Sequence, residues 1–486
     1  MLRARGCLLV VFFGLGVAYG CTSEASAVPP GDAGADAVTL VDARIDVPDV
    51  GPKHRLSPFE GGGPTSELTI IDLPLADPHV DVPFDVPEGA LGFHVLVQSL
   101  GSSIAGLSIE SIRDPMGTLV HENNGPVGAS HPTSDSQTGM VASAQVPQGG
   151  VFAGIALPKG KWVVRFGGGS PVRAKIQIQT TPDGKFHGGL LNVNVFVPEG
   201  LVMDRKEVTA QSALTHAGVI KRLEGFFDLV YDLYGLRNGT LRFFDIPAKY
   251  VTIENAELDD VFAETRVLPA GQSVSLFLSE PSDNGDWWGV AGGIPGSANT
   301  TGTDQSGFAL ASQVDATVEE SFVLAHELGH FMGLNHTSEM DGRWTDPLPD
   351  TPECPDMFKL KTNCPDYDNI MFALGKHAKP ITTSTMQRRV VQGSPMFQAF
   401  IAGAPPPASV LRRESFRSLD FGRMFGKPGA QLDDAELRVV GASCKHPSHV
   451  VPPLTSADRA NVARIADDPR VSKVMRGVAR RLLRTP

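Results

Sequence analysis

The sequence lacks the excess of positive charge that nucleic-acid-binding proteins carry. It has 42 Lys and Arg against 54 Asp and Glu, which gives a net charge of −12. We therefore expect no nucleic-acid partner. The 486 residues are enough for two or three domains, and 41% of them are hydrophobic, so ordinary apolar cores are available.

Long apolar runs are also scarce, because the chain beyond its N-terminus has none that reaches the roughly 18 residues needed to span a membrane. At the N-terminus, two arginines precede the apolar segment Cys7–Val17, which is too short for a mature membrane helix. This order predicts a signal peptide over residues 1–20. The sequence Ala18-Tyr19-Gly20-Cys21 resembles a bacterial lipobox, in which the cysteine is lipidated and becomes the first residue. Ordinary signal cleavage near Ala25 or Ala27 is the alternative.

Residues 21–64 are poor in aromatic side chains and rich in Ala, Asp, Pro and Gly. Such a composition cannot bury a core, so we expect a disordered tether here. With Cys21 lipidated, the protein is exported and held at the outer membrane or cell surface by a lipid anchor. With ordinary cleavage it is secreted.

Cysteine is rare as well, with five residues in the whole chain. Cys7 is removed with the signal, and Cys21 is the proposed lipidation site. The other three lie in an oxidising compartment if the chain is exported. Cys354 and Cys364 are close enough in sequence to staple one loop, so we predict a disulfide between them. Pairing of Cys444 with either of the two is left open.

Residues 65–182 alternate short apolar runs with turn signals, as the string Lys175-Ile176-Gln177-Ile178-Gln179 illustrates. Short strands at this spacing predict a β-sandwich. Phrases such as Pro158-Lys159-Gly160-Lys161-Trp162 resemble the sandwich domains appended to secreted bacterial proteases. The sequence leaves three roles open for this domain, namely a pro-segment, a binding domain or a structural appendage.

Residues 188–400 combine strand and helix patterns, which predicts an α/β domain. Apolar spacing over residues 401–486 predicts a helical C-terminal extension. Within the α/β domain we expect strands at 191–197, 241–244 and 274–278, and helices at about 206–234 and 318–334.

The chemistry is carried by one segment, which reads HELGHFMGLNH from His326 to His336. On a helix, His326 and His330 project from one face and can grip one ion, while Glu327 can reach a metal-bound water. Gly333 lets the helix end in a sharp turn, which costs a residue with a Cβ much more. The turn brings His336 to the ion from another direction.

Three protein nitrogens leave a fourth position for water, which is typical of a catalytic zinc site rather than a structural one. Zinc acidifies that water, and a carboxylate beside it can accept its proton during attack on a peptide carbonyl. We therefore predict Zn²⁺ as the cofactor, His326, His330 and His336 as its ligands, and Glu327 as the general base.

This motif resembles that of the metzincin zinc peptidases, and the resemblance covers about residues 190–400. It implies a two-lobed fold with an α/β upper lobe and a Met-turn below the metal. The string Asn369-Ile370-Met371-Phe372 fits such a turn and assigns Met371 to it. The strings around Glu339 and Cys354 look like the pappalysin branch, which includes secreted bacterial endopeptidases. The predicted fold class is therefore multidomain, with an N-terminal β-sandwich, an α/β metzincin-like zinc peptidase domain and a helical C-terminal extension.

Two departures from the family pattern are visible. Relatives often place a Tyr two residues after the Met-turn methionine, where it helps to stabilise the tetrahedral intermediate, whereas this sequence has Ala373. Tyr367 and His377 are the nearby groups that could take this role. A latency motif, in which a pro-segment cysteine caps the zinc, is not present either.

Two further segments bear on the site. Residues 341–368 are rich in Asp and Glu, whose oxygens suit Ca²⁺, and pappalysin-like relatives bind that ion, so calcium is a second expected metal. A solvated charged loop is the alternative. The Gly-rich end of Asp286–Gly293 could form the edge strand of the cleft, where a peptide backbone would pair.

The leading functional prediction is a zinc endopeptidase that acts on a protein or peptide substrate. The alternative is a surface-anchored binding lipoprotein with an inactive protease-like domain, and the intact Glu327 argues against it. A serine hydrolase is disfavoured because the sequence has no Gly-x-Ser-x-Gly elbow, and the phosphate-binding Gly-x-x-x-x-Gly-Lys-Ser/Thr loop is absent too.

Overall fold

We analysed a computed structural model of the chain. It describes residues 66–401, except 100–106, 124–135, 139–140, 154, 269–270, 282–286, 313–316, 340–341, 343–344, 361–362 and 374–380. The predicted signal peptide, the tether, Cys21, His377, Cys444 and nearly all of the predicted C-terminal extension lie outside these residues. No helix among the described residues is long and apolar enough to cross a membrane.

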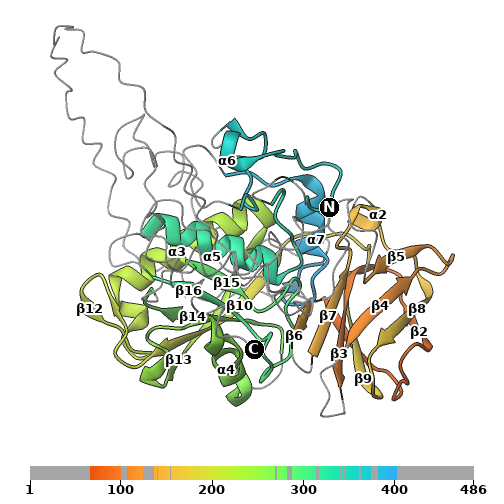
Figure 1. The fold of residues 1–486 in the computed structure, drawn as a ribbon, viewed down its shortest axis with the longest axis horizontal. Helices are drawn as coiled ribbons and strands as arrows, with labels where there is room; N and C mark the ends of the chain where they lie inside the picture. The colour runs from red at the N-terminus through yellow and green to blue at the C-terminus, as the bar shows by residue number, and fades with distance from the viewer. Residues whose placement is uncertain are drawn as a thin grey trace, which may run out of the picture.

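The N-terminal region consists of two antiparallel sheets that face each other (Figure 1). The first has the strand order β1-β9-β3-β7-β6 and the second β2-β8-β4-β5. The strands are β1 (Glu67–Asp72), β2 (Asp81–Val86), β3 (Ala90–Ser99), β4 (Ser108–Arg113), β5 (Leu119–Glu122), β6 (Ser136–Thr138), β7 (Val141–Val146), β8 (Gly160–Gly167) and β9 (Val172–Thr180), with the short helix α2 (Gly150–Ala153) after β7. The region thus has the architecture of a β-sandwich, as predicted for it.

The core of the sandwich lies between its two sheets, because alternate residues of each strand point inward. Trp162 of β8 is fully buried and meets Phe93 of β3 edge to face, with ring centroids 5.0 Å apart. Val95, Ile176 and Ile178 are buried in the same cluster. This core belongs to the sandwich alone, so its strands do not depend on the rest of the chain for an apolar interior.

The second region is built on a mostly parallel sheet with the order β13-β10-β14-β16-β15, and β17 pairs with β10. Neighbours run parallel from β13 to β16, whereas β15 runs antiparallel to β16 at the edge. The strands are β10 (Gly189–Pro198), β13 (Leu236–Ile246), β14 (Val274–Ser279), β15 (Gly289–Ala291), β16 (Phe308–Ala311) and β17 (Gln398–Ala399), and a hairpin is formed by β11 (Val202–Met203) and β12 (Lys206–Glu207). The Gly-rich end of 286–293 is therefore an edge strand, as expected.

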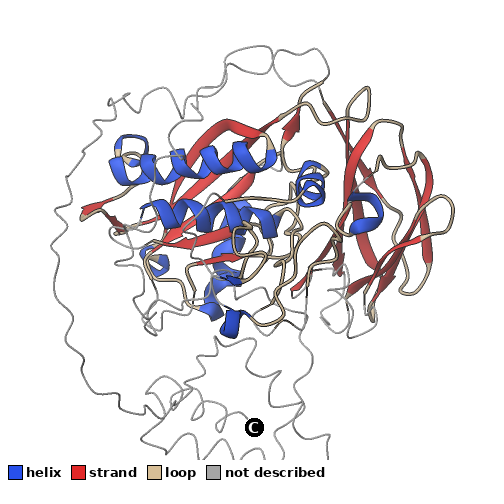
Figure 2. Ribbon diagram, turned by 90° about the horizontal axis from the view of Figure 1, so that it is seen from above, coloured by secondary structure: helices blue, strands red, loops and turns tan. Residues whose placement is uncertain are grey.

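Both faces of the sheet are buried at its inner strands β10, β14 and β16, which is why these strands are mostly apolar. One face packs on α3 (Ala217–Tyr234) and α5 (Thr317–Phe331), and the other on α4 (Leu258–Ala263). Figure 2 shows the long helices lying over the strands of this sheet, whereas the sandwich consists almost wholly of strands. The remaining helices are α6 (Met357–Leu360) and α7 (Thr385–Gln392).

Helix α3 is shorter than the sequence prediction of 206–234. It begins at Ala217, where the His216 ring accepts a hydrogen bond from the Val219 amide, and it ends at Gly235 with a φ of 76°. The missing part begins with β12, the second strand of the β11–β12 hairpin, and then the hydroxyl of Ser212 accepts a bond from the Thr209 amide. These local bonds compete with helix formation, which is a property of Ser and Thr side chains.

Candidate metal centre

Helix α5 carries the first part of the motif and ends in a glycine turn. His326, Glu327 and His330 lie on its last two turns and are fully buried. Gly333 follows with a φ of 100°, a conformation that favours glycine. The Leu334 amide donates to the Gly329 carbonyl at 2.9 Å, which closes the turn. The chain then reverses direction and brings His336 back toward the helix.

The three histidines are each held by a hydrogen bond at Nδ1. The Nδ1 atom of His326 lies 2.6 Å from the Ile370 carbonyl, and that of His330 lies 2.7 Å from the Leu334 carbonyl. A carbonyl oxygen only accepts, so both rings donate from Nδ1 and carry a lone pair at Nε2. Burial lowers the pKa of His330 to about 3, with the nearby His336 adding to the effect, so this ring is neutral.

The three Nε2 atoms face one another. That of His336 lies 3.3 Å from His326 Nε2 and 3.1 Å from His330 Nε2. Because His326 and His330 both carry their ring proton on Nδ1, their Nε2 lone pairs point into the same small space. A cation can accept these converging nitrogen lone pairs, and imidazole nitrogens are ligands that suit Zn²⁺. The residues present therefore fit a metal ion.

Glu327 lies fully buried beside this cluster. Neither of its carboxylate oxygens has a hydrogen-bond partner of ordinary geometry among the described residues. Burial raises the pKa of Glu327 well above its usual value, and the backbone amide of Ala291 opposes the rise. A Cβ on Gly289 would lie 2.7 Å from Glu327 Oε1, so strand β15 packs directly over this carboxylate.

The Met-turn string lies directly against the histidines. Asn369 Oδ1 accepts the Met371 amide at 2.8 Å, which folds the turn, and Ile370 supplies the carbonyl that fixes His326. Met371 is fully buried. Asn369 and Gln387 of α7 exchange two side-chain hydrogen bonds of 2.9 and 3.2 Å, so α7 holds the turn in place.

Gly329, between the two helical histidines, has a packing role. A Cβ there would lie 2.6 Å from Met371 Sδ and 3.1 Å from Tyr234 Oη. The absence of a side chain lets the Met-turn approach the helix closely. The geometry thus explains both glycines of the motif, one by a close contact and the other by its backbone conformation.

The comparison with known families agrees with this geometry. Residues 257–371 match the model of the metallo-peptidase family M12, named Reprolysin_5. This segment is metallopeptidase-like. It runs from the start of α4 through the edge strand and α5 to Met371.

Other comparisons add little to the metallopeptidase-like segment. No curated protein sequence is significantly similar to the chain. A solved structure of a salicylyl-acyltransferase from a tetracycline biosynthetic pathway aligns with 68% of this chain and 95% of its own, at 10% identity and a TM-score of 0.12. A score this low carries no argument about fold or function.

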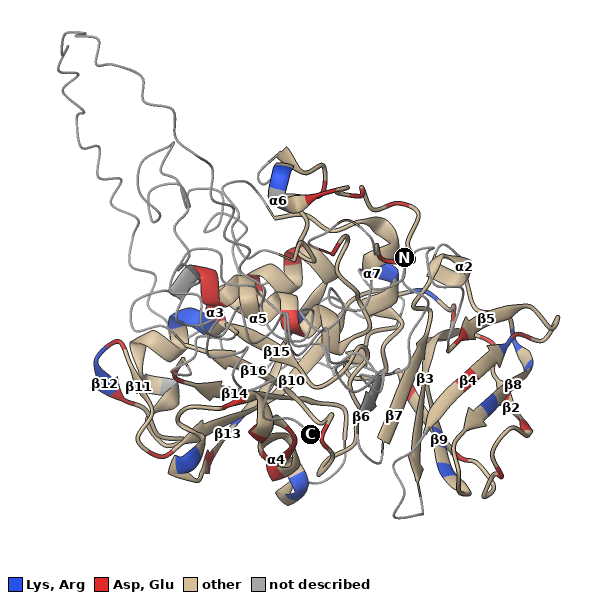
Figure 3. Cartoon of the chain, in the orientation of Figure 1, with Lys and Arg blue, Asp and Glu red and all other residues tan. Residues whose placement is uncertain are grey.

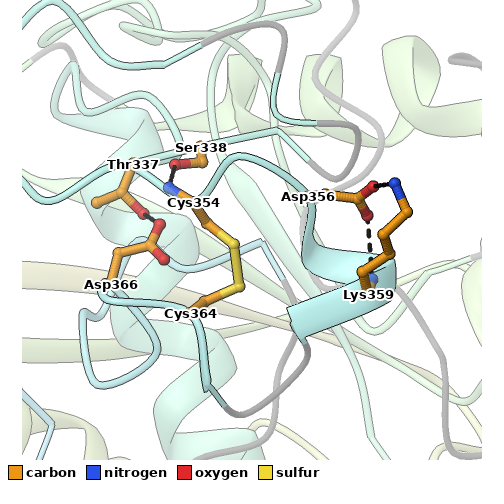
Figure 4. The surroundings of a disulfide bond; sticks show 7 residues. All are labelled: Thr337, Ser338, Cys354, Asp356, Lys359, Cys364 and Asp366. Atoms are coloured by element: carbon orange, nitrogen blue, oxygen red, sulfur yellow. Dashed lines mark hydrogen bonds and ion pairs between the residues drawn. A yellow bond between two sulfur atoms is a disulfide. The ribbon is translucent and has the colours of Figure 1, made fainter.

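The predicted disulfide is present in the loop that follows the three histidines. Cys354 and Cys364 are bonded, with their Cα atoms 5.2 Å apart, and both are buried (Figure 4). Ser338 Oγ accepts the Cys354 amide at 2.7 Å, which ties the loop to the chain just beyond His336. The disulfide therefore staples the segment that carries the third histidine.

The acidic residues of this loop do not gather at one point in the described part of the chain. Asp346 accepts from Thr351 and the Leu348 amide, and Asp366 accepts from Thr337 (Figure 4). The one other group of potential metal ligands among described residues joins Asp366 to the two disulfide sulfurs, which are not free to bind a metal. Among the described residues of the loop calcium has no ligand set, and the ion stays a prediction from the family resemblance.

The structure bears on one departure from the family pattern, the Ala373 that stands where relatives often have a tyrosine. Ala373 is buried directly after the Met-turn, and it supplies no hydroxyl. Tyr367 packs its ring on Phe372 with centroids 5.4 Å apart, in the apolar cluster around the disulfide. His377 lies outside the described residues. The geometry therefore assigns no group to the missing tyrosine's place.

Sequence reasoning gave no role to Glu339, which the structure places against the cluster. Its Oε1 lies 3.0 Å from His336 Nδ1. A carboxylate behind a ligating histidine fixes the ring and raises its basicity. The only sequence signal is its position three residues after His336, and such a short spacing is too common to assign a role.

Proposed function

We propose that the protein is a zinc-dependent endopeptidase. The observation that carries the proposal is the convergence of three Nε2 atoms beside the buried Glu327 carboxylate. The match to a metallopeptidase family over residues 257–371 supports the same reaction class. His326, His330 and His336 would hold the zinc, with Glu339 orienting His336.

Bound zinc would polarise the scissile carbonyl and lower the pKa of the attacking water. Glu327 takes the proton of that water at a carboxylate oxygen and delivers it to the amine nitrogen of the departing peptide. The Nδ1 hydrogen bonds keep the three rings from turning during the reaction.

A peptide substrate would pair with strand β15. This strand is the antiparallel edge of the sheet, and Gly289 at its start lies against Glu327. An extended peptide that adds to this edge brings its carbonyls past the carboxylate, and main-chain hydrogen bonds hold it regardless of sequence. The proposed substrate class is therefore an extended segment of protein or peptide.

The test separates a metal ligand from a base. Wild-type protein should hold one zinc ion by elemental analysis, and His330→Ala should lose most of it because one of three nitrogens is gone. Glu327→Ala should retain the zinc, yet lose at least about 10²-fold in cleavage of a denatured protein, since general-base assistance is worth about 10² to 10⁴.

Two results would contradict the proposal. Equal cleavage by Glu327→Ala and wild type would rule out the assigned base. A wild type that binds zinc but cleaves no substrate, either as the full-length protein or after proteolytic maturation, would favour the alternative. That alternative is a surface-anchored binding lipoprotein with an inactive protease-like domain.

We also propose that the enzyme is a pappalysin-like lipoprotein exported to the outer membrane or cell surface, with Cys21 as the lipidated residue. The lipobox-like string before Cys21 and the low-complexity segment 21–64 support this placement. Cells that express the protein should incorporate labelled palmitate, and Cys21→Ser should abolish the label. Equal labelling of both proteins, or of neither, would contradict the anchor.

A further inference from the structure

The sandwich presents an uncharged polar face to the metallopeptidase-like region. Strands β3 and β7 contain no Asp, Glu, Lys or Arg, whereas β2, β4 and β8 of the other sheet do, and β9 carries Arg173 and Lys175 before its two buried glutamines (Figure 3). Buried side chains of this face reach backbone carbonyls across the boundary. His94 Nε2 donates to Gly296 O at 2.9 Å, and Gln177 Nε2 donates to Ala298 O at 2.6 Å. Such bonds require a fixed arrangement of the two regions.

Gln145 of β7 differs from the others in what it holds. Its Nε2 donates to Met332 O at 3.1 Å and to Val390 O at 2.8 Å, and its side chain is 1% exposed. Met332 is the residue after α5, where helix carbonyls have no partner within the helix. One amide of the sandwich therefore satisfies the end of the histidine-bearing helix and joins it to α7.

Both elements joined by Gln145 position metal ligands. The turn beyond Met332 supplies Leu334 O, which accepts from His330, and then leads to His336. Helix α7 holds Asn369 of the Met-turn, and the next residue's carbonyl accepts from His326. A shift of either element moves a histidine nitrogen, because these carbonyls fix the rings.

The glycine turn itself packs on Gln145. A Cβ at Gly333 would lie 3.3 Å from Gln145 Nε2 and 3.6 Å from its Cδ, so the side chain lies directly against the turn. We propose that Gln145 is a positioning residue for the zinc site, through which the β-sandwich sets the metal affinity of the peptidase region. The sandwich then acts as a permanent part of the metal site rather than as a removable pro-segment. The inference rests on the proposed function in so far as the site binds zinc.

The test compares two glutamines of the same face in the full-length protein. Gln145→Met keeps the side-chain length and removes the donors. Gln177→Met makes the same change on β9, where the bonds go to Ala298 and Asn299 rather than to α5 or α7. The zinc dissociation constant is measured by competition with a chelator. We expect at least a tenfold weaker affinity for Gln145→Met, the range found for groups behind metal ligands, and less than threefold for Gln177→Met.

Two further readouts separate positioning from a general loss of stability. The unfolding midpoint of the metal-free protein should fall by a similar amount in both variants, whereas the visible absorption of the Co²⁺-loaded protein should change in Gln145→Met alone. Affinity within threefold of wild type for Gln145→Met, or an equal loss in both variants, would overturn the inference.

If Gln145→Met does not fold, Gln145→Asn replaces it, since it keeps the amide but withdraws it by one methylene. A folded Gln145→Asn is expected to bind zinc more weakly, and wild-type affinity would overturn the inference. A wild type that binds no zinc contradicts the proposed function itself. None of these measurements uses cleavage activity, so a wild type that binds zinc but is inactive would leave this inference standing.

Discussion

At the level of single residues, the rings of His326 and His330 are fixed both by the helix that carries them and by backbone carbonyls that accept from their Nδ1 atoms. Positions 326 and 330 predict a shared helical face, and the glycine at 333 predicts a turn, so the convergence of three rings follows from the sequence pattern. The oxygen atoms that contact the Nδ1 atoms of these rings do not follow from the pattern. The Ile370 carbonyl reaches His326 from 44 positions away in the chain, and such a contact depends on the tertiary fold alone.

Gly329 is a residue whose substitution has two opposing effects. Alanine in a helix interior is favoured over glycine by about 1 kcal/mol. The new Cβ would meet Met371 Sδ at 2.6 Å, however, and overpacking of a rigid core typically costs about 1 to 3 kcal/mol. We expect the clash to prevail, so Gly329→Ala should lower the free energy of unfolding by about 1 kcal/mol in urea titrations.

A matched control is Gly271→Ala, because a Cβ at that position meets nothing within 4 Å and its backbone conformation suits any residue. Its unfolding free energy should stay within about 0.5 kcal/mol of wild type. A Gly329→Ala protein as stable as this control would show that the Met-turn can move away from the new Cβ without lowering the free energy of unfolding.

At the level of elements, apolar periodicity located the helices but not all of their ends. The apolar stripe from Leu214 to Leu233 predicted α3, and its extension back to 206 was wrong because β12 and the Ser and Thr bonds occupy the start of that stretch. The edge strand was predictable from its glycines. Pairing order was not, since β10 lies between β13 and β14, which come later in the chain.

A buried ion pair joins the two long helices, and neither residue drew attention in the sequence. Arg222 Nε of α3 donates to Glu320 Oε2 of α5, and both side chains are almost wholly buried. Glu320→Leu would remove the buried counterion of Arg222, whose other ion pair is with the partly exposed Asp204. Loss of one partner of a buried pair typically costs about 3 to 5 kcal/mol, so we expect a destabilisation of that size in urea titrations.

The double variant Arg222→Met, Glu320→Leu should recover much of this loss, because it removes both fully buried charges and leaves only the partly exposed Asp204 without its ion pair. Glu88→Gln, which breaks the exposed pair with Lys159, serves as the comparison and should leave the unfolding midpoint unchanged. If the losses of the two single variants simply add in the double variant, the two side chains do not act as a pair.

At the level of the whole molecule, the sandwich could be predicted but its attachment could not. The alternation in Lys175–Gln179 identifies a strand with one apolar face, and the glutamines on the other face read as solvent-exposed. In the structure Gln177 and Gln179 are buried against the second region. A polar strand face has the same sequence pattern whether water or another domain covers it, so the contact appears only in three dimensions.

This attachment makes the stability of the molecule depend on pH through His94. The ring is fully buried at the boundary, where its Nε2 donates to Gly296 O, and burial lowers its pKa from 6.5 to about 4. In the unfolded chain the ring takes up a proton below pH 6.5, whereas the folded protein resists until about pH 4. The stabilising contribution is therefore complete above pH 6.5 and is lost as the pH falls toward 4.

Between pH 7.5 and pH 5 this group alone removes roughly 2 kcal/mol of unfolding free energy, at about 1.4 kcal/mol for each pH unit below 6.5. His94→Gln keeps a donor for Gly296 and does not titrate, so its urea-unfolding free energy should fall by roughly 2 kcal/mol less than wild type over that interval. His121→Gln should show the same gain, because His121 is buried inside the sandwich with its pKa also lowered to about 4. A flattened profile for His121→Gln but not for His94→Gln would mean that water reaches His94, and that the two regions separate before the molecule unfolds.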